Sequence, residues 1–498
     1  MNVILPLLIV LPLLGAGLSM AAWRSVRTQQ IIGVVVLACC VGFAVLVTIQ
    51  VAADGPFAVD MGGWRAPMGI TLVADLLASM LLTVSLITVL GVFIYAIGQP
   101  RADKGAYYFH ALYLVLAAGV SAAFLTGDLF NLFVAFEIML SASYVLITLG
   151  GRGEQVRSGM TYIVINLLAS TLLVSTIGLI YAATGSVNMA DVAVRFAEVP
   201  DGMQMALGAL LLVTFGIKAA IFPLFFWLPD SYPTAPVAVT AVFAGLLTKI
   251  GVYSIIRTQT LLFPDGGGAT IVLVAAGLTM VVGVLGAIAQ DDMKRILSFH
   301  IVSQIGYMLF GLGLYSVSGI AAAVFYVIHH IPVKTVLFLV NGLVETVTGT
   351  AALHRLGGLL RRAPFIAAMF LIGGLSLAGI PPFSGFFGKL SLIEAGFEGR
   401  AWFITGVSIA VSALTLFSMT KIWAGVFWGE PNEPPPLESA RGDGPLRAPA
   451  LMNLATIGLV AVTIAVAVFA QPLWELSTRA SEQLLDSQQN YIDVVLDR

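Results

Sequence analysis

The sequence consists of apolar runs long enough to cross a membrane, separated by short polar segments. A helix needs about 20 mainly apolar residues to span the hydrocarbon core of a bilayer. Hydrophobic residues make up 59% of the chain and charged residues only 10%, which excludes a soluble domain of this length. We therefore expect an all-α polytopic membrane protein with about fourteen transmembrane helices. The expected ranges are 3–22, 31–53, 70–98, 107–126, 129–150, 158–183, 203–228, 236–257, 268–290, 295–316, 318–345, 363–396, 401–428 and 449–473.

Five lysines lie inside these expected spans, whereas no arginine does. An ammonium group at bilayer depth costs about 3 kcal/mol or more, so such residues usually face a wet interior and have a function. Lysine loses its proton readily when it is desolvated, while guanidinium stays charged. The selection of lysine therefore favours proton transfer over purely structural ion pairs. The five residues are Lys218, Lys249, Lys334, Lys389 and Lys421.

Prolines interrupt two of the expected helices close to these lysines. Pro223 and three further prolines follow Lys218, and the sequence GIPPFSGFFGKL at 379–390 contains Lys389. A proline removes a helical N–H group and clashes with the preceding turn, so both helices should be broken. Broken membrane helices tend to line ion sites, because their freed backbone groups need a partner.

A weak internal repeat relates the two broken helices. TKIGVYSIIR carries a lysine 31 residues after Lys218, and the similar TKIWAGVFWG carries one 32 residues after Lys389. The repeated units would be helices 4–8 and helices 9–13, and an odd number of spans in each makes them inverted five-helix repeats, as in many transporters. The expected segments are 1–106 with three helices, 107–257 and 258–428 with the repeats, a Pro-rich cytoplasmic loop at 429–448, and a last helix and tail at 449–498.

Acidic and histidine side chains at membrane depth extend the candidate set. Glu137 lies about 12 Å into its helix by helical rise and could form an ion pair with Lys218 that holds both groups charged. His330 and Lys334 share a helix face, whereas His329 points about 100° away. These groups could relay protons, since histidine titrates in the useful range. The alternatives are a structural salt bridge for Glu137 and core hydrogen bonds for each histidine.

Four further polar residues have less specific settings. His300, Ser303 and Gln304 could carry a water chain between the units or make ordinary interhelical hydrogen bonds. Lys421 lies near a helix end and next to Trp423, which favours snorkelling to the membrane interface over a relay role.

The basic residues outside the spans are distributed unevenly between alternate loops. One set of loops holds thirteen lysines and arginines, while the other set, with the tail, holds six, including Arg257. Cytoplasmic loops carry the excess of positive residues, so both termini are expected on the outer side of the cell membrane. In the tail, Leu484, Leu485, Ile492 and Val495 predict a short helix whose apolar stripe contacts a neighbouring subunit.

Three stretches carry a resemblance to a known family: FNLFVAFE at 130–137, WLPDSYPTAPVAVTAVFAGLLTKIGVYSIIR at 227–257 and GIPPFSGFFGKL at 379–390. They resemble the proton-conducting antiporter-like subunits shared by respiratory complex I and the multisubunit Mrp cation/proton antiporters. The resemblance covers helices 4–13. It implies an essential glutamate on helix 5, matched by Glu137, and lysines on helices 7, 8 and 12, matched by Lys218, Lys249 and Lys389.

The resemblance also implies a mechanism and partners. Protons would cross through two half-channels joined by a polar axis at mid-membrane and drive Na⁺ or another monovalent cation outward, within a hetero-oligomeric complex of companion subunits. A redox-driven proton-pumping subunit of complex I or of a membrane-bound hydrogenase, and a non-transporting scaffold or membrane enzyme, remain as alternatives. No dinucleotide fingerprint, Walker A loop, CxxC cluster or HExxH motif occurs, so we expect no cofactor, no metal and no enzymatic chemistry. The net charge of −2 does not indicate nucleic-acid binding.

Overall fold

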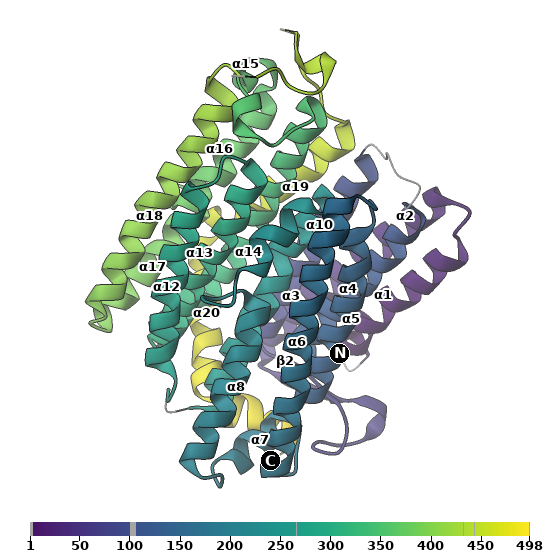
Figure 1. Ribbon diagram of the computed structural model, residues 1–498. Helices are drawn as coiled ribbons and strands as arrows, with labels where there is room; N and C mark the ends of the chain where they lie inside the picture. The colour runs from purple at the N-terminus through teal and green to yellow at the C-terminus, as the bar shows by residue number, and fades with distance from the viewer. Residues whose placement is uncertain (1–2, 100–105, 265, 432, 443, 498) are drawn as a thin grey trace.

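The computed structural model describes residues 3–99, 106–264, 266–431, 433–442 and 444–497 as a bundle of long helices (Figure 1). Within these ranges, thirteen helices are long and apolar enough to cross a membrane. Two shorter helices, α16 and α17, follow one another across a break and make a fourteenth crossing. The expectation of a multi-pass protein with about fourteen spans is confirmed.

The elements fall into four groups along the chain. The first comprises α1 (Ile4–Ala21), α2 (Val26–Asp54), β1 (Phe57–Asp60), η1 (Met61–Gly63), β2 (Thr71–Ala74) and α3 (Leu76–Gly98). The second comprises α4 (Ala106–Leu125), α5 (Leu129–Thr148), α6 (Gly153–Thr184), α7 (Met189–Phe196), α8 (Asp201–Ala219), α9 (Trp227–Ser231), η2 (Tyr232–Thr234), α10 (Val237–Val242), the π-helix η3 (Phe243–Leu247) and α11 (Thr248–Leu262).

The third group comprises α12 (Ala269–Ile288), α13 (Met293–Gly313), α14 (Val317–Thr348), η4 (Leu353–Arg355), α15 (Leu359–Arg362), α16 (Pro364–Ala378), α17 (Ser384–Glu398), α18 (Trp402–Trp423) and the π-helix η5 (Ala424–Trp428). The fourth comprises η6 (Glu438–Ala440), α19 (Ala450–Val468), α20 (Ala470–Leu485), the π-helix η7 (Gln488–Ile492) and α21 (Asp493–Leu496).

The second and third groups repeat one another at a constant offset of 164 residues through their first three spans, from Asp128 to Asp292 and from Gly185 to Gly349. Asp128 accepts from the Asn131 N–H at 2.7 Å, and Asp292 accepts from the Arg295 N–H at 3.0 Å, so each caps the second helix of its unit.

The helix ends of the two units also match. Gly185 and Gly349 end the third helix of each unit with φ of 71° and 83°, a conformation that favours glycine. The backbone bond from Leu129 N–H to Val187 O is matched by the bond from Met293 N–H to Ala351 O. The internal repeat is therefore real, and five crossings in each unit invert the second relative to the first.

Both predicted breaks are present, but they divide their helices differently. The chain leaves α8 at Ala220, with φ of 60°, and leaves α16 at Gly379, with φ of 86°. Lys218 precedes the first break, whereas Lys389 follows the second, inside α17. The near-equal spacing from each lysine to its TKI sequence therefore does not reflect structural equivalence.

A β-hairpin replaces the start of the helix expected at 70–98. β1 pairs antiparallel with β2, from Phe57 opposite Ala74 to Asp60 opposite Thr71. Asp75 then accepts from the Ala78 N–H at 2.8 Å and caps α3. The apolar content of 70–74 suits a strand as well as a helix, so hydropathy alone extended the helix too far.

Arg257 corrects two expectations about the first unit. α11 continues to Leu262, beyond the expected boundary at 257, so Arg257 lies inside a span and not in a loop. Its Nη2 is 2.5 Å from Asp75 Oδ2, and both side chains are buried. An arginine is therefore present at depth, where a carboxylate and two aromatic rings, those of Tyr253 and Tyr491, contact it.

The C-terminal tail folds back on its own chain. Instead of one helix to residue 473, α19 ends at Val468 and α20 runs along α14 and α3, at the end of the bundle where α7 lies (Figure 1). Leu484, Ile492 and Val495 are at most 5% exposed. The predicted apolar stripe thus exists, but the prediction that it faces a neighbouring subunit is wrong.

Candidate functional site

Four of the five predicted lysines lie in the interior of the bundle. Lys218, Lys249, Lys334 and Lys389 are each at most 5% exposed, although an isolated charge is costly in an apolar core. Lys218 comes from α8, Lys249 from α11, Lys334 from α14 and Lys389 from α17. The two units together therefore bring basic side chains from four helices into the core.

Lys218 faces a small cavity beside the first break. Its Nζ donates to Ser170 Oγ at 3.1 Å and lies 4.7 Å from the centre of the Phe136 ring. A cavity of about 30 Å³ adjoins it, lined also by Ser143, Tyr162 and Asn166. This volume is sufficient for a water molecule, and the hydroxyl and amide groups supply the partners that a buried water needs.

Glu137 does not form the predicted direct ion pair with Lys218 among the described contacts. Phe136, one residue earlier on α5, places its ring against the ammonium, and Ser170 accepts a hydrogen bond from it. Glu137 Oε1 is buried without a partner among the described residues. The carboxylate is nevertheless close enough to interact electrostatically with Lys218. A water or a side-chain rotation would be needed to connect the two groups.

Lys249 lies directly after the π-helix η3. Its Nζ donates to Ala244 O at 2.5 Å and to Thr248 Oγ1 at 3.2 Å, with no carboxylate among its described partners. A Cβ at Gly245 would lie 2.3 Å from Thr335 Oγ1, so only glycine allows η3 to approach α14 this closely. The π-helix therefore presents Lys249 toward the polar face of α14. π-bulges often mark functional positions in helices.

His330 and Lys334 lie at the centre of the bundle on α14. Both are fully buried, and neither ring nitrogen of His330 nor Lys334 Nζ has a hydrogen-bond partner among the described residues. His330 interacts electrostatically with Lys249, Lys334, His329 and His300. Since buried polar atoms are rarely left unpaired, this position calls for water or for a proton-exchanging group.

Lys389 completes the series in the second unit. Its Nζ donates to Ala378 O and to Ser412 Oγ, each at 3.0 Å, and lies 4.9 Å from the centre of the Tyr307 ring. His329 Nδ1 lies 2.8 Å from Ser384 Oγ at the start of α17. A Cβ at Gly385 would lie 1.8 Å from Ser376 O, so glycine at this position lets the break close around these groups.

The remaining candidates differ in their surroundings. His300 Nε2 lies 2.9 Å from Ser418 Oγ, and His300 interacts electrostatically with Lys334 and Lys389. Ser303 donates to Met280 O at 3.0 Å and so joins α13 to α12. Lys421 donates to Ile288 O and Gln290 O and forms an ion pair with Asp291, at the end of α12, where its side chain is partly exposed.

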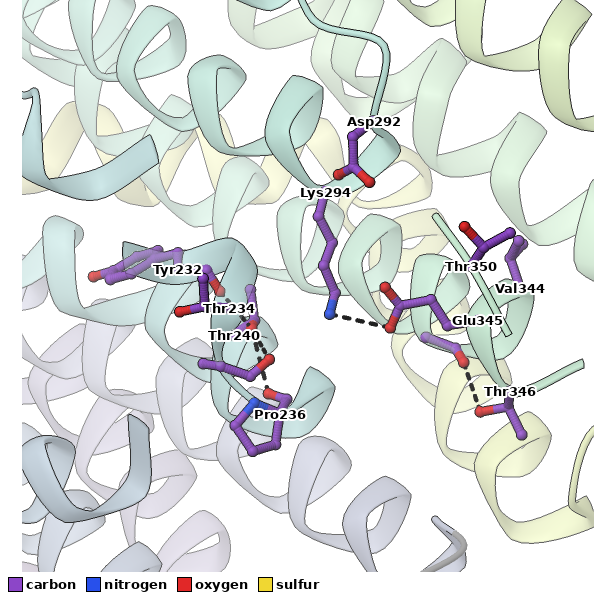
Figure 2. Close-up of polar contacts among 12 residues, drawn as sticks. Tyr232, Thr234, Pro236, Thr240, Asp292, Lys294, Val344, Glu345, Thr346 and Thr350 are labelled. Carbon is purple, nitrogen blue, oxygen red and sulfur yellow. Dashed lines mark hydrogen bonds and ion pairs between the residues drawn. The ribbon is translucent and has the colours of Figure 1, made fainter. Parts of the chain in front are cut away.

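Polar contacts at the helix ends hold the two units around this interior. Lys294 Nζ is 3.0 Å from Glu345 Oε2 and joins α13 to α14 (Figure 2). On the other side of the same view, the Thr240 hydroxyl donates to Tyr232 O at 2.8 Å and closes the interruption before α10 (Figure 2). These contacts fix the interrupted backbone beside the buried lysines.

Sequence reasoning missed the uncharged partners of the buried lysines. Ser170, Tyr162, Ser384 and Ser412 are single polar residues in apolar helices, and nothing in their local sequence distinguishes them. The 164-residue offset was a usable signal, because it aligns Tyr162 with Tyr326 and so marks both helices.

The described residues therefore define an ion-carrying membrane protein built from two inverted units, with titratable side chains joined across its core. A family described as the NADH:quinone oxidoreductase/Mrp antiporter transmembrane family matches residues 126–415. The chain belongs to this family, as its sequence motifs predicted.

Known proteins extend the similarity over nearly the whole chain. The Na(+)/H(+) antiporter subunit that is named D in Alkalihalophilus pseudofirmus is 46% identical over 466 residues, covering 91% of this chain and 93% of the relative. A chain in the structure of the Mrp complex from Dietzia sp. DQ12-45-1b is 35% identical, with a TM-score of 0.91 and 99% of both chains covered. A chain of the membrane-bound sulfane sulfur reductase, an archaeal respiratory membrane complex, is 26% identical, with a TM-score of 0.91 and 100% of both chains covered.

Proposed function

We propose that this chain is the proton-conducting membrane subunit of a multisubunit monovalent cation/proton antiporter, with Na⁺ or a similar cation as the exchanged ion. The observation that carries the proposal is the series of buried titratable groups from α8 to α17. The relative named as an Na(+)/H(+) antiporter subunit, at 46% identity, supports the antiporter over the redox-driven alternative. We infer a transporter and not a catalytic enzyme, acting with the other subunits of the complex.

The proposed path begins at Lys218 and ends at Lys389. Glu137 stabilises the proton on Lys218, and the water-sized cavity beside Lys218 allows that proton to leave toward Lys249. His330 or Lys334 receives it and passes it to Lys389. The electrostatic contacts of His330 with Lys249 and Lys334 support this order.

The driving force is the membrane potential together with the proton gradient. A unit charge that crosses the full membrane gains about 2.3 kcal/mol per 100 mV. Lysine and histidine can each release and rebind a proton, so each step needs no permanent charge at depth. We further propose that both termini lie outside, because the loops with more basic residues then face the cytoplasm.

The proposal is tested by purifying the complex through a tag on this chain and measuring cation-dependent proton flux in proteoliposomes. Glu137→Ala should abolish the flux while the complex still assembles, because Lys218 loses the carboxylate that stabilises its proton. Glu398→Ala, which removes an exposed carboxylate at the end of α17, serves as the matched control. Near-normal flux with Glu137→Ala would contradict the assigned role of Glu137.

Mass spectrometry of the same preparation distinguishes the two function classes. Small antiporter subunits among the co-purifying chains support the proposal. The sulfane sulfur reductase similarity gives the second candidate its support, and quinone-binding or iron–sulfur subunits in the preparation would establish that candidate instead.

A further inference from the structure

An arginine-lined cavity lies away from the proton path, at the end of the bundle where α15 lies (Figure 1). The cavity measures about 900 Å³ and is enclosed by α15, by η5 and by the loop that leads to α19. This volume falls within the range of about 300–1,000 Å³ that is usual for small-molecule sites. Its described charged lining consists of Arg355, Arg361, Arg362, Arg441 and one carboxylate, Glu430.

The arginines of this cavity have hydrogen-bonding capacity to spare. Arg362 donates from Nε to Gly444 O and from Nη1 to Ala440 O, while its Nη2 is buried without a partner among the described residues. The Arg361 side chain makes no ion pair or hydrogen bond within the described chain, whereas Arg355 is bound to Glu433. The cavity therefore carries uncompensated positive charge, and guanidinium groups bind phosphate oxygens well.

An apolar groove continues from the cavity along the exposed side of the second unit. It measures about 300 Å³, lies between α16 and α18, and is lined by Phe370, Leu371, Leu375 and Met419 among others. Trp428 lines both the groove and the cavity and is 63% exposed. Tryptophan is typical of the membrane–water interface, where a lipid has its headgroup on one side and its chains on the other.

We propose that this end of the second unit binds one anionic phospholipid. The phosphodiester lies among Arg361, Arg362 and Arg441, and one acyl chain lies in the groove between α16 and α18. Charge complementarity selects the headgroup, and the continuity of a basic cavity with an apolar groove at Trp428 favours a lipid over a free anion or a protein segment. The site is separate from the proton path, so the proposal does not depend on the transport role.

The headgroup contact is tested by native mass spectrometry of the full-length chain with the subunits that co-purify, after delipidation and addition of phosphatidylglycerol or zwitterionic phosphatidylcholine. We expect retention of one phosphatidylglycerol, reduced about tenfold by Arg362→Gln. Because Arg362 also holds the loop, Arg361→Gln is a second variant that removes charge without removing an internal contact. Arg157→Gln, at an exposed arginine of α6 outside the cavity, should leave retention unchanged.

The acyl-chain contact is tested by filling the groove. A Cβ at Gly374 would lie 3.4 Å from the Phe370 ring, an ordinary contact, so Gly374→Leu fits at its Cβ and extends into the groove. It should lower phosphatidylglycerol retention several-fold without changing the binding of inorganic phosphate. Gly406→Leu is the matched control, because a Cβ there meets nothing within 4 Å on the exposed face of α18.

Three results would overturn the proposal. Equal retention of phosphatidylcholine and phosphatidylglycerol would show that the arginines do not select the headgroup. Full displacement of the lipid by inorganic phosphate, with no effect of Gly374→Leu, would indicate a free-anion site. Cross-linking of a companion protein to a photoreactive residue at position 428, with no lipid retained, would assign the surface to a protein contact.

Discussion

The two five-helix units share a backbone but differ in which helix carries the polar side chains. At the 164-residue offset, Ile165, Asn166 and Ser170 of α6 correspond to His329, His330 and Lys334 of α14. On the second helix of each unit the exchange is reversed in kind, because Phe136 and Glu137 of α5 correspond to His300 and Ile301 of α13. The second unit has therefore moved titratable groups onto its third helix.

Burial explains why α14 can carry these groups and α6 cannot. The whole hydrophobic window of α14 is buried, whereas only 39% of that of α6 is, and α6 exposes residues such as Val164 and Leu168. α14 packs against helices of both units and of the N- and C-terminal segments. A charge on α6 would face lipid on much of its circumference, while a charge on α14 faces protein everywhere. Position in the bundle, more than the repeat, decides where a relay can be built.

The comparison is broken most directly by giving α14 the residues of α6. The double variant His330→Asn with Lys334→Ser should lower cation-dependent proton flux about a hundredfold, within the range that a positioned proton-transfer group contributes. The control Ile328→Leu keeps volume and polarity on the same helix and should remain active. Flux of the double variant close to wild type would mean that the polar groups of α14 are structural.

Arg257 sharpens the comparison in α11, since the corresponding helix α18 contains no arginine. Arg257→Gln leaves Asp75 buried without its partner, which should lower the free energy of unfolding by about 3 kcal/mol. Arg195→Gln removes an arginine that is 46% exposed from its ion pair with Asp191, and should cost less than about 1 kcal/mol. Thermal unfolding of the purified variants gives both values, and equal losses would contradict the ranking.

The smallest expected difference concerns the two capping aspartates. Burial raises the pKa of Asp128 from 3.8 to about 6, although N–H groups of Asn131 and Phe130 lower it. Because the folded state holds this proton more tightly than the unfolded state, the contribution of Asp128 to stability is greatest below about pH 4 and is lost as the pH rises through about 6.

Asp128→Asn keeps the cap and stays neutral, so its stability relative to wild type should rise by about 2 kcal/mol between pH 4 and pH 7. The matched variant at the equivalent position of the second unit, Asp292→Asn, is the control. Melting temperatures measured across this pH range give the comparison. A flat difference for Asp128→Asn would show that Asp128 keeps its charge at all of these pH values.

The number of spans, both breaks and the buried lysines could be predicted from the sequence, because apolar length, proline and charge at depth are local properties. The neighbours of these lysines could not. Whether Lys218 meets Glu137 or Phe136 depends on a rotation of about 100° of α5, which hydropathy does not determine. Arg257 was misplaced for a related reason, since its partner Asp75 lies far away in the chain and only the fold brings the two together.

The central claim is that a proton must pass through Lys249, whereas Lys421, in the similar TKI sequence of the second unit, only caps the end of α12. Cation-dependent proton flux in proteoliposomes of the purified complex tests this most directly. Lys249→Ala should stop the flux, Lys249→Arg should restore little of it because guanidinium does not release its proton, and Lys421→Ala should retain substantial activity. Robust flux with Lys249→Ala, or an assembled but fully inactive Lys421→Ala complex, would show that the relay lies elsewhere.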